Sequence, residues 1–541
     1  MRYLIAFLLG VAVVSATIQP SRSADAGSLL AMHGQYVGWQ FGSFATMRVQ
    51  GNATDSAGNA QGSWQTLEIG AAYRTVTQGN VPGMTGDSGF TGRVFWNSDE
   101  NGFTRPNYSA YQNYAISVYA LFNEGTSQLS GTLETPVTIG STSYPVVRVT
   151  PPNGDAIDLA IDPSTGAYVR ATVDPGGPYE TTFNILGYTG FGSGKRYIGS
   201  YRIEGSDGTA TVTSVQANVP VSTSDLHPPS PTATWNFTNA QPIPITVTTD
   251  AAIVDATING VPGRFVIDSG ASGLVVSGDF ASRAHLATTG GGDIQGLVGP
   301  HSASYARVTL GVGGNTLQNV SAVVAGRDYT VNVQAYHEEE GTVTINGYLG
   351  FPLFGAAIVT LSMSNKTLTI QDPSQTVVDH TSGWPAQVDL SDNIPMIPVL
   401  VDGRATLQAA LDSGNGSFVS LSQDAVTRYH IPILASAGTM STVGQMYQGV
   451  NSNFDPEAGT ELQGYVSSHV VVRDITGQEE IEPCSTVSSI ALGPITYQNT
   501  TACVSQHMTG DWIIMGFAFM ENFDLVFDYP EGIILFRPHH Q

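Results

Sequence analysis

Two Asp-Ser-Gly triplets are the residues of this 541-residue chain best suited to catalysis. Asp268-Ser269-Gly270 and Asp412-Ser413-Gly414 each follow a run of apolar residues. Because glycine lets a tight loop approach a reacting group, a carboxylate in this setting is suited to general acid–base chemistry. A lone Asp-Ser-Gly is also a common β-turn, so either triplet alone leaves that structural interpretation open.

The two triplets lie in segments of similar pattern. A turn at Asn259-Gly260 and then an apolar strand precede the first triplet, and a turn at Asp402-Gly403 and an apolar strand precede the second. Asp268 lies 8 residues after its turn glycine, and Asp412 lies 9 residues after its own. Each carboxylate is therefore expected at the end of a strand that follows a hairpin turn.

Both segments also close in the same way. An apolar-apolar-Gly motif ends at Gly350 in the first segment and at Gly516 in the second. Two strand-like runs joined by a turn follow each motif, over 358–370 and 525–536. Four matching features indicate a single β unit that occurs twice.

The run Val266-Ile267-Asp268-Ser269-Gly270-Ala271-Ser272, with Leu349-Gly350 downstream, resembles the retropepsin-like aspartic proteases of the pepsin-type clan. Exported bacterial versions carry two such units in tandem, and the resemblance extends over about 300 residues, from Gln241 onwards. It implies two β-barrel units that form one bilobal protease. It also implies Asp268 and Asp412 as the catalytic dyad, without a metal, a cofactor or a covalent intermediate.

The resemblance gives the other motif positions supporting roles. The serines would hydrogen-bond the carboxylates, the loop glycines would allow close approach, and the downstream glycines would brace the loops. The positions concerned are Ser269, Gly270, Ser413 and Gly414 in the loops and Gly350 and Gly516 as braces. A glycine-rich hairpin containing Gly291, Gly292 and Gly296 is the predicted flap over the cleft, with 443–447 as a weaker candidate in the second unit.

The second loop departs from the family pattern at Asn415-Gly416, where small residues followed by Ser are usual. The additional glycine is expected to loosen that loop. An alternative function therefore stays open, that of a non-catalytic exported binding protein with a degenerate protease fold and a lipid- or peptide-binding amino-terminal domain. Composition alone also leaves open a carboxylate pair for glycoside hydrolysis.

Proline-rich and turn-rich breaks divide the chain into three folded blocks. We predict an amino-terminal domain over 27–226, a linker over 227–240, a first unit over 241–372, a linker over 373–389 and a second unit over 390–541. The amino-terminal block is β throughout, and its segment Val147–Asp174 resembles part of the LolA-like half-barrel domains of lipoprotein-sorting chaperones. The expected fold is mainly β: a half-barrel-like domain followed by two tandem β-barrel units.

The first 26 residues have the layout of a secretory signal peptide. The weakly positive Met1-Arg2 precedes the apolar run Tyr3–Ala16, and Ala24-Asp25-Ala26 offers a small-x-small cleavage site. Because that run is short for a bilayer span, we expect an exported, periplasmic or secreted protein without an integral membrane segment after signal removal. A retained anchor is the alternative.

Cys484 and Cys503 suit an oxidising compartment, either as one disulfide or as two buried thiols.

The charge balance restricts the partners. The chain has 20 Lys+Arg against 44 Asp+Glu, a formal net charge of −24, and only Lys195 and Lys366 are lysines. Such a surface repels nucleic-acid phosphates and anionic membranes. The 61 glycines and 29 prolines favour many short strands over long helices. Together with these exclusions, the resemblance to aspartic proteases predicts a monomeric aspartic endopeptidase that acts on a peptide or protein substrate.

Overall fold

Three bodies of β structure follow one another along the chain, so the expected mainly β fold with two β-barrels is confirmed. The computed structural model describes residues 25–79, 85–107, 110–238, 240–248, 250–296, 299–334, 340–431, 461–463, 469–473, 479–505, 508, 510 and 512–538. The predicted signal peptide, apart from its last two residues, and the candidate flap at 443–447 lie outside the described residues.

The amino-terminal domain is built on one antiparallel sheet of 13 strands in the order β6-β5-β4-β3-β2-β1-β13-β12-β11-β10-β9-β8-β7. The strands are β1 (Thr46–Thr54), β2 (Ala60–Ile69), β3 (Ala72–Gly79), β4 (Thr85–Phe90), β5 (Phe95–Ser98), β6 (Thr104–Asn107), β7 (Gly131–Ile139), β8 (Thr142–Val149), β9 (Ile157–Ile161), β10 (Tyr168–Val173), β11 (Thr181–Phe191), β12 (Lys195–Ile203) and β13 (Thr209–Ala217). Two consecutive meanders meet where β1 pairs with β13. The sheet is therefore open, with β6 and β7 at its edges.

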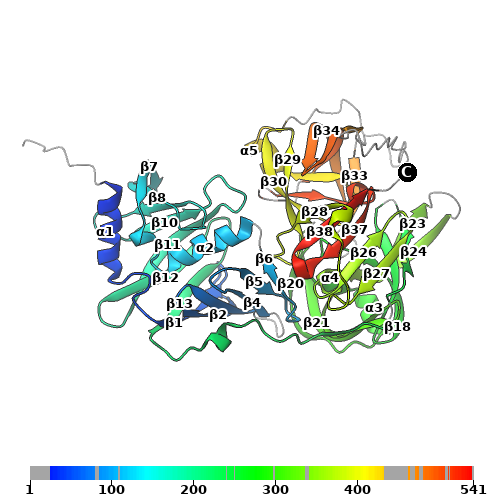
Figure 1. Ribbon diagram of the computed structural model, residues 1–541, viewed down its shortest axis with the longest axis horizontal. Helices are drawn as coiled ribbons and strands as arrows, with labels where there is room; N and C mark the ends of the chain where they lie inside the picture. Colours follow the sequence, from blue (N-terminus) through cyan, green and yellow to red (C-terminus); the bar gives the residue numbers. More distant parts are fainter. Residues whose placement is uncertain are drawn as a thin grey trace, which may run out of the picture.

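Two helices cover this sheet (Figure 1). Helix α1 (Ala26–Val37) begins at Asp25, whose carboxylate accepts a hydrogen bond from the N–H of Ser28 (2.7 Å), a normal N-cap. Helix α2 (Ala110–Phe122) buries Leu121 in the same apolar core as α1 and the middle strands. Burial against the helices explains why apolar and polar residues alternate along strands such as β1.

The first carboxy-terminal unit contains a closed barrel of six strands in the order β22-β19-β25-β18-β17-β21, with β21 pairing back to β22. These strands are β17 (Ala252–Ile258), β18 (Val261–Ile267), β19 (Leu274–Val276), β21 (Gly299–Val312), β22 (Asn315–Val324) and β25 (Gly347–Leu349). Strand β18 runs parallel to β25, and β19 runs parallel to β22. All other neighbours around the barrel are antiparallel.

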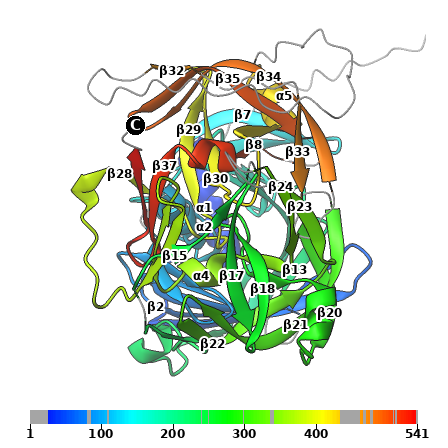
Figure 2. The same cartoon turned by 90° about the vertical axis from the view of Figure 1, so that its right-hand side faces the viewer.

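The second unit repeats this topology strand for strand. Its closed barrel has the order β35-β31-β36-β30-β29-β34, and β34 pairs back to β35. These strands are β29 (Met396–Val401), β30 (Ala405–Leu411), β31 (Val419–Ser422), β34 (Glu479–Leu492), β35 (Ile495–Ser505) and β36 (Ile513–Met515). The two parallel pairs, β30 with β36 and β31 with β35, occupy the equivalent positions. Figure 2 faces the two barrels, the green one below the orange one.

Short elements complete the two units. They are β14 (Thr234–Asn236), β16 (Thr246–Val247), α3 (Gly278–Arg283), β20 (Thr289–Gly296), β23 (Tyr329–Gln334), β24 (Glu340–Ile345), α4 (Phe351–Phe354), α5 (Gln423–Arg428), β32 (Glu461–Gln463), β33 (His469–Arg473) and α6 (Phe517–Met520). Among the described residues, 3-10 turns occur in the amino-terminal domain as η1 (Thr126–Gln128) and η2 (Thr223–Leu226), and further along the chain as η3 (His380–Ser382) and η4 (Tyr529–Glu531). Strand β14 lies inside the segment predicted as the first linker and pairs with β22.

A six-stranded sheet joins the two units in the order β15-β27-β26-β37-β38-β28. Its strands are β15 (Ile243–Pro244), β26 (Ile358–Ser362), β27 (Thr367–Gln371), β28 (Trp384–Gln387), β37 (Phe523–Asp528) and β38 (Ile533–Pro538). At its centre Thr360 pairs with Val526. When Gly350 is aligned with Gly516, these two residues are equivalent, so a pseudo-twofold axis passes through their pair.

Most buried apolar side chains of the two units form one continuous core through both barrels, with smaller clusters beside it. The amino-terminal domain has a separate core under its helices. One residue of the amino-terminal domain, Phe103, belongs to the core of the barrels. Within the described ranges, no helix combines the length and the apolar character that a membrane span requires.

Candidate active site

Asp268 and Asp412 occupy equivalent places at the ends of β18 and β30. The N–H of Asp268 donates to the carbonyl of Leu349 (3.0 Å), and the N–H of Asp412 donates to the carbonyl of Met515 (3.0 Å). Each acceptor belongs to the parallel neighbour strand, β25 or β36. The chain therefore leaves both strands in the same way, and the pseudo-twofold axis brings the two loops together.

Each carboxyl group lies against the glycine of the opposite loop. A Cβ atom added to Gly270 would overlap Cγ of Asp412, and one added to Gly414 would overlap Cγ of Asp268. Only residues without a side chain leave this space free. The structure thus brings together the two aspartates and the two loop glycines named from the sequence.

Backbone N–H groups hold each carboxylate within its own loop. The N–H groups of Gly270 and Ala271 donate to Oδ1 of Asp268 (2.9 and 3.0 Å). The N–H of Gly414 donates to Oδ1 of Asp412 (2.9 Å). These bonds fix one oxygen of each carboxyl group in place and favour its charged form.

Burial raises the pKa of both carboxyl groups. Burial raises the pKa of Asp268, which is 4% exposed, well above its usual value, and the charge of Asp412 and a hydrogen bond between the carboxyls raise it further. Burial also raises the pKa of Asp412, although the hydrogen bond with Asp268 and two backbone N–H groups oppose this shift. Two buried carboxyl groups held this close cannot both carry a full charge, so the geometry suits one proton shared between Asp268 and Asp412.

The two serines tie the loops to each other. Oγ of Ser269 donates to the carbonyl of Leu411 (2.7 Å) and accepts from the N–H of Ser413 (3.0 Å). Reciprocally, Oγ of Ser413 donates to the carbonyl of Ile267 (2.8 Å) and accepts from the N–H of Ser269 (2.9 Å). The sequence expectation was a bond from each hydroxyl to a carboxylate. The structure differs because each hydroxyl has a single hydrogen to donate, and it donates this hydrogen to a backbone carbonyl at the end of the opposite strand.

Gly350 and Gly516 pack on the backs of the two loops. A Cβ atom on Gly350 would overlap the carbonyl of Gly273, and one on Gly516 would overlap the carbonyl of Ser417. In each unit the next N–H donates into the loop, from Phe351 to Ala271 (2.8 Å) and correspondingly from Phe517 to Asn415 (2.5 Å). The glycines named from the sequence therefore lie in the bracing positions.

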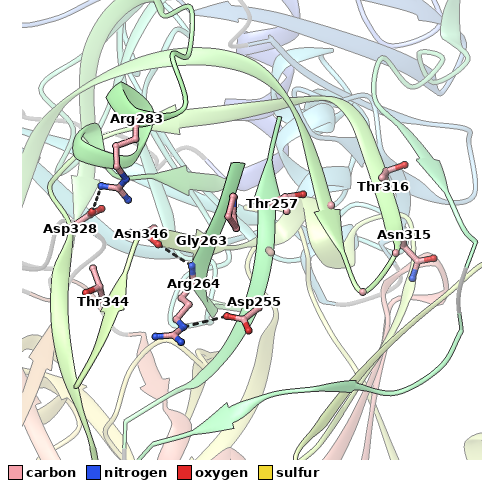
Figure 3. A pocket seen from close by; sticks show the side chains of 15 residues that line it. Asp255, Thr257, Gly263, Arg264, Arg283, Asn315, Thr316, Asp328, Thr344 and Asn346 are labelled. Carbon is pink, nitrogen blue, oxygen red and sulfur yellow. Dashed lines mark hydrogen bonds and ion pairs between the residues drawn. The ribbon is translucent and has the colours of Figure 1, made fainter. Parts of the chain in front are cut away.

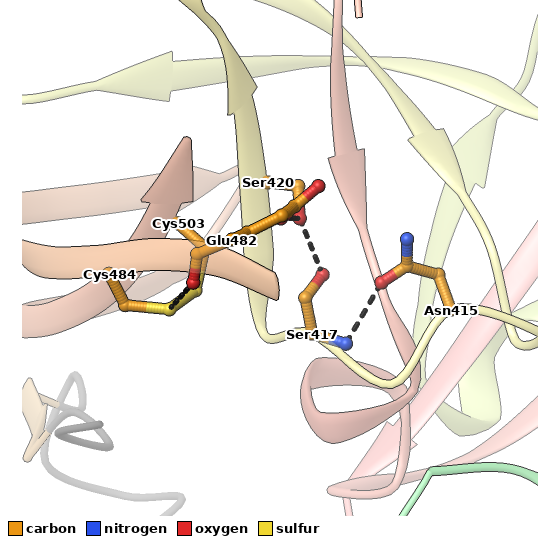
Figure 4. The surroundings of a disulfide bond; sticks show 6 residues. All are labelled: Asn415, Ser417, Ser420, Glu482, Cys484 and Cys503. Atoms are coloured by element: carbon orange, nitrogen blue, oxygen red, sulfur yellow. Dashed lines mark hydrogen bonds between the residues drawn. A yellow bond between two sulfur atoms is a disulfide. The ribbon is translucent and has the colours of Figure 1, made fainter. Parts of the chain in front are cut away.

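The unusual second loop is closed by its own side chains. Oδ1 of the buried Asn415 accepts from the N–H of Ser417 (2.9 Å). A hydroxyl–hydroxyl bond joins Ser417 to Ser420 (3.0 Å), and Ser420 donates to the buried carboxylate of Glu482 (2.6 Å; Figure 4). Asn415 therefore compensates for the freedom that Gly416 was expected to add. Sequence reasoning missed Glu482, because its partner lies 62 residues away.

The local geometry agrees with one comparison. Residues 254–353 match the aspartyl protease family model. This range contains Asp268 and its bracing Gly350, and it supports a retropepsin-like unit in the first barrel. No curated protein matches the chain. A solved DUF1329 family protein from Desulfovibrio piger is 10% identical over 37% of this chain and 95% of that chain, with a TM-score of 0.27, which is too low to carry an argument.

A disulfide between Cys484 and Cys503 lies behind the second loop of this protease-like site. The two cysteines face each other on β34 and β35, and Cys503 also pairs with Ser420 of β31. Of the two alternatives left open by the sequence, the structure contains the disulfide. The strand that follows the Asp412 loop is thus linked to a covalently closed hairpin.

The predicted flap forms a hairpin of β20 and β21. Gly292 pairs with Ala303, and Gly296 pairs with Gly299 near the tip. Tyr305, opposite Thr289 at the base of this hairpin, lines a cavity of about 770 Å³ that borders the first loop at 270–273. The lid role of Gly291, Gly292 and Gly296 stays a prediction.

The amino-terminal domain and both units line this cavity. The first loop and strands β21 and β22 contribute from the first unit, the turn 391–394 before β29 contributes from the second, and β4 and β5 contribute from the amino-terminal domain. A separate cavity of about 840 Å³ lies on the first unit, where Arg264 pairs with Asp255 (3.3 Å) and Arg283 with Asp328 (2.6 Å; Figure 3). Of these two cavities, the one of about 770 Å³ borders the loop of Asp268, at 270–273.

Proposed function

We propose that this chain is an aspartic endopeptidase in which Asp268 and Asp412 activate a water molecule. The reciprocal placement of each carboxyl group against the glycine of the opposite loop carries the proposal. The aspartyl protease match over 254–353 supports the reaction class. A cavity of about 770 Å³ beside the first loop provides space for a peptide segment.

The first step uses the one proton that Asp268 and Asp412 share. The ionised aspartate takes a proton from water while the water oxygen attacks the carbonyl carbon of the peptide bond. The protonated aspartate donates its proton to the carbonyl oxygen, which gives a neutral tetrahedral diol. The buried N–H groups around both carboxylates hold them in place and so lower the cost of reorganisation.

The second step reverses the two roles. The aspartate that gave up its proton takes back a proton from one hydroxyl of the diol, and the other aspartate gives its proton to the peptide nitrogen. The carbon–nitrogen bond breaks, which releases a carboxylic acid and an amine and returns the pair to its starting state. The peptide and one water molecule supply every atom of the two products, and the carboxyl groups only transfer protons.

The remaining sequence predictions complete the proposal. We propose that the chain is exported after loss of residues 1–26, which the disulfide suits, and that it acts as a monomer on peptide or protein substrates. We retain the division into an amino-terminal domain (27–226) and two protease units (241–372 and 390–541).

The test is proteolysis of an unfolded protein, read by mass spectrometry of the new peptide ends. Wild type should generate them, and Asp268→Asn and Asp412→Asn should each fail to do so. Asp255→Asn is the matched control, because it removes an exposed carboxylate of the same unit outside the site. Undiminished cleavage by both dyad variants would contradict the proposal, and it would favour a role as a binding protein if wild type were inactive.

A further inference from the structure

The amino-terminal domain is built into the protease units. Phe103, in the turn before β6, is 4% exposed and packs in the core of the barrels. Asn101, beside it, accepts through Oδ1 from the N–H of Ser321 on β22 (2.8 Å) and from Arg307 (3.2 Å). The edge strand β6 therefore lies against the protease-like part, which encloses its side chains.

Arg105 of β6 connects this edge to the first aspartate loop. The residue is fully buried. Its guanidinium donates to the carbonyl of Leu390 (2.8 and 3.2 Å) and to Asn393, and its Cζ lies 4.2 Å from the ring centroid of Phe351. The N–H of Phe351 in turn donates to Ala271 in the loop of Asp268. One residue thus separates the guanidinium from that loop.

The same edge also reaches the strand of the second aspartate. Asn107 and Tyr179 donate to the two carboxylate oxygens of the buried Asp389 (2.6 and 2.5 Å). Asp389 exchanges two backbone hydrogen bonds with Met396 (both 2.9 Å), the first residue of β29. Strand β29 pairs with β30, at whose end Asp412 lies. The amino-terminal domain therefore contacts residues that support both dyad loops, Phe351 for the first loop and Asp389 for the second.

Acidic residues around Arg105 favour its positive charge. Burial lowers its pKa to about 10, while the nearby carboxyl groups of Asp99, Glu100 and Asp389 oppose this shift, so the group stays cationic at neutral pH. The ring of Tyr529 stacks on Phe351 with the ring centroids 5.8 Å apart, and burial raises the pKa of Tyr529 well above its usual value. A neutral side chain in place of Arg105 would remove the cation over Phe351 and leave the carbonyl of Leu390 without these donors.

We propose that Arg105 is a positioning residue for the Asp268/Asp412 pair, and that the amino-terminal domain is a structural part of the active site. The domain holds both dyad loops in register and forms one wall of the cavity beside them. The kinetic side of this inference rests on the proposed peptidase function. The structural side, the ordering of the two loops, does not.

The kinetic test compares Arg105→Met, Arg105→Lys and Arg148→Met in the full chain. Arg148 is the matched control, because it forms a two-point ion pair with Asp158 (2.6 Å for both bonds) far along the same sheet. We expect Arg105→Met to lower kcat by about 10- to 100-fold with KM changed by less than about 3-fold, because the loops lose their alignment. Arg105→Lys should recover much of kcat, and Arg148→Met should match wild type.

A milder variant covers the case in which Arg105→Met does not fold. Tyr179→Phe removes only the hydroxyl that bonds Asp389, and it should lower kcat several-fold without affecting the fold. Unchanged kcat in Tyr179→Phe and in every folded Arg105 variant would overturn the inference. A rise in KM alone would also overturn it.

Hydrogen exchange separates this inference from the peptidase proposal. The amides of Gly270, Ala271 and Gly414, which bond the dyad carboxylates, should exchange faster in Arg105→Met than in Arg148→Met. Faster exchange at these loops supports positioning even if wild type proves inactive, in which case only the peptidase proposal fails. Exchange equal to that of wild type would contradict positioning.

Discussion

Ser269 and Ser413 illustrate what a residue can do beyond the role that its motif indicates. Each hydroxyl is enclosed between the two loops, where it donates to one backbone carbonyl and accepts from one backbone N–H. The motif placed both serines beside an aspartate, but the partner of each hydroxyl is about 140 residues away in the sequence and could not be read from spacing. The roles of the aspartates and glycines were easier to predict from the sequence. A carboxylate suits acid–base chemistry, and a glycine suits a place where two loops approach closely.

Ser413→Ala tests this role at the residue scale. The substitution leaves the carbonyl of Ile267 and the N–H of Ser269 buried without their partners, so the free energy of unfolding should fall by about 1–3 kcal/mol. Urea unfolding measures the change. Ser282→Ala, which removes an exposed hydroxyl in α3, is the control and should change stability by less than about 0.5 kcal/mol. Equal effects of the two variants would contradict the role.

At the scale of elements, the repeat in the sequence predicted the repeat in topology. Turn, strand, aspartate loop and bracing glycine lie close together in the chain, so local patterns specify them. The closure of each barrel and the pairing of β26 with β37 join distant segments, and no local pattern encodes them. For the same reason β14 and β28 fall inside segments predicted as linkers: both are short edge strands whose pairing partners lie far along the chain.

Gly350→Ala tests the bracing element. The added methyl group would overlap backbone carbonyls of the Asp268 loop, so the loop must shift. We expect the free energy of unfolding to fall by about 1–3 kcal/mol and the rate of proteolysis to fall at least about 10-fold. Gly190→Ala on β11 is the control, since its Cβ would lie 3.9 Å from the nearest atom, the carbonyl of Lys195. A Gly350→Ala enzyme as stable and active as the control would contradict the brace.

At the scale of the whole molecule, the acidic composition argued against nucleic-acid and anionic-membrane partners, but it said little about how the three blocks pack together. The sequence indicated three blocks. The amino-terminal domain contacts the supports of the dyad loops through residues such as Arg105, whose partner Leu390 lies 285 residues away. Nothing near Arg105 in the sequence marks it as special, so only the fold reveals its place.

The pH dependence of stability is a property of the whole molecule. Burial raises the pKa of Glu68, which is 5% exposed, to about 7 from 4.5. Between these values the folded chain keeps a proton that the unfolded chain releases, so the stabilisation is complete below the unfolded value and is lost as pH rises to about 7. The net charge of −24 acts in the same direction.

We therefore expect the free energy of unfolding to be higher at pH 5 than at pH 7.5, with up to about 3 kcal/mol of the difference due to Glu68. Urea unfolding at both pH values measures this difference, and Glu68→Gln should reduce it. Equal pH dependence in wild type and Glu68→Gln would contradict the assignment.

The central claim is that Asp268 and Asp412 work as one catalytic unit. The most direct test is a double-mutant cycle on the rate of peptide hydrolysis, with Asp268→Asn, Asp412→Asn and the double variant. Because the pair shares one proton, each single variant should lose at least about 10³-fold in kcat, and the double variant should lose no more than either single one. Substantial activity in a single variant, or losses that multiply in the double variant, would contradict the claim.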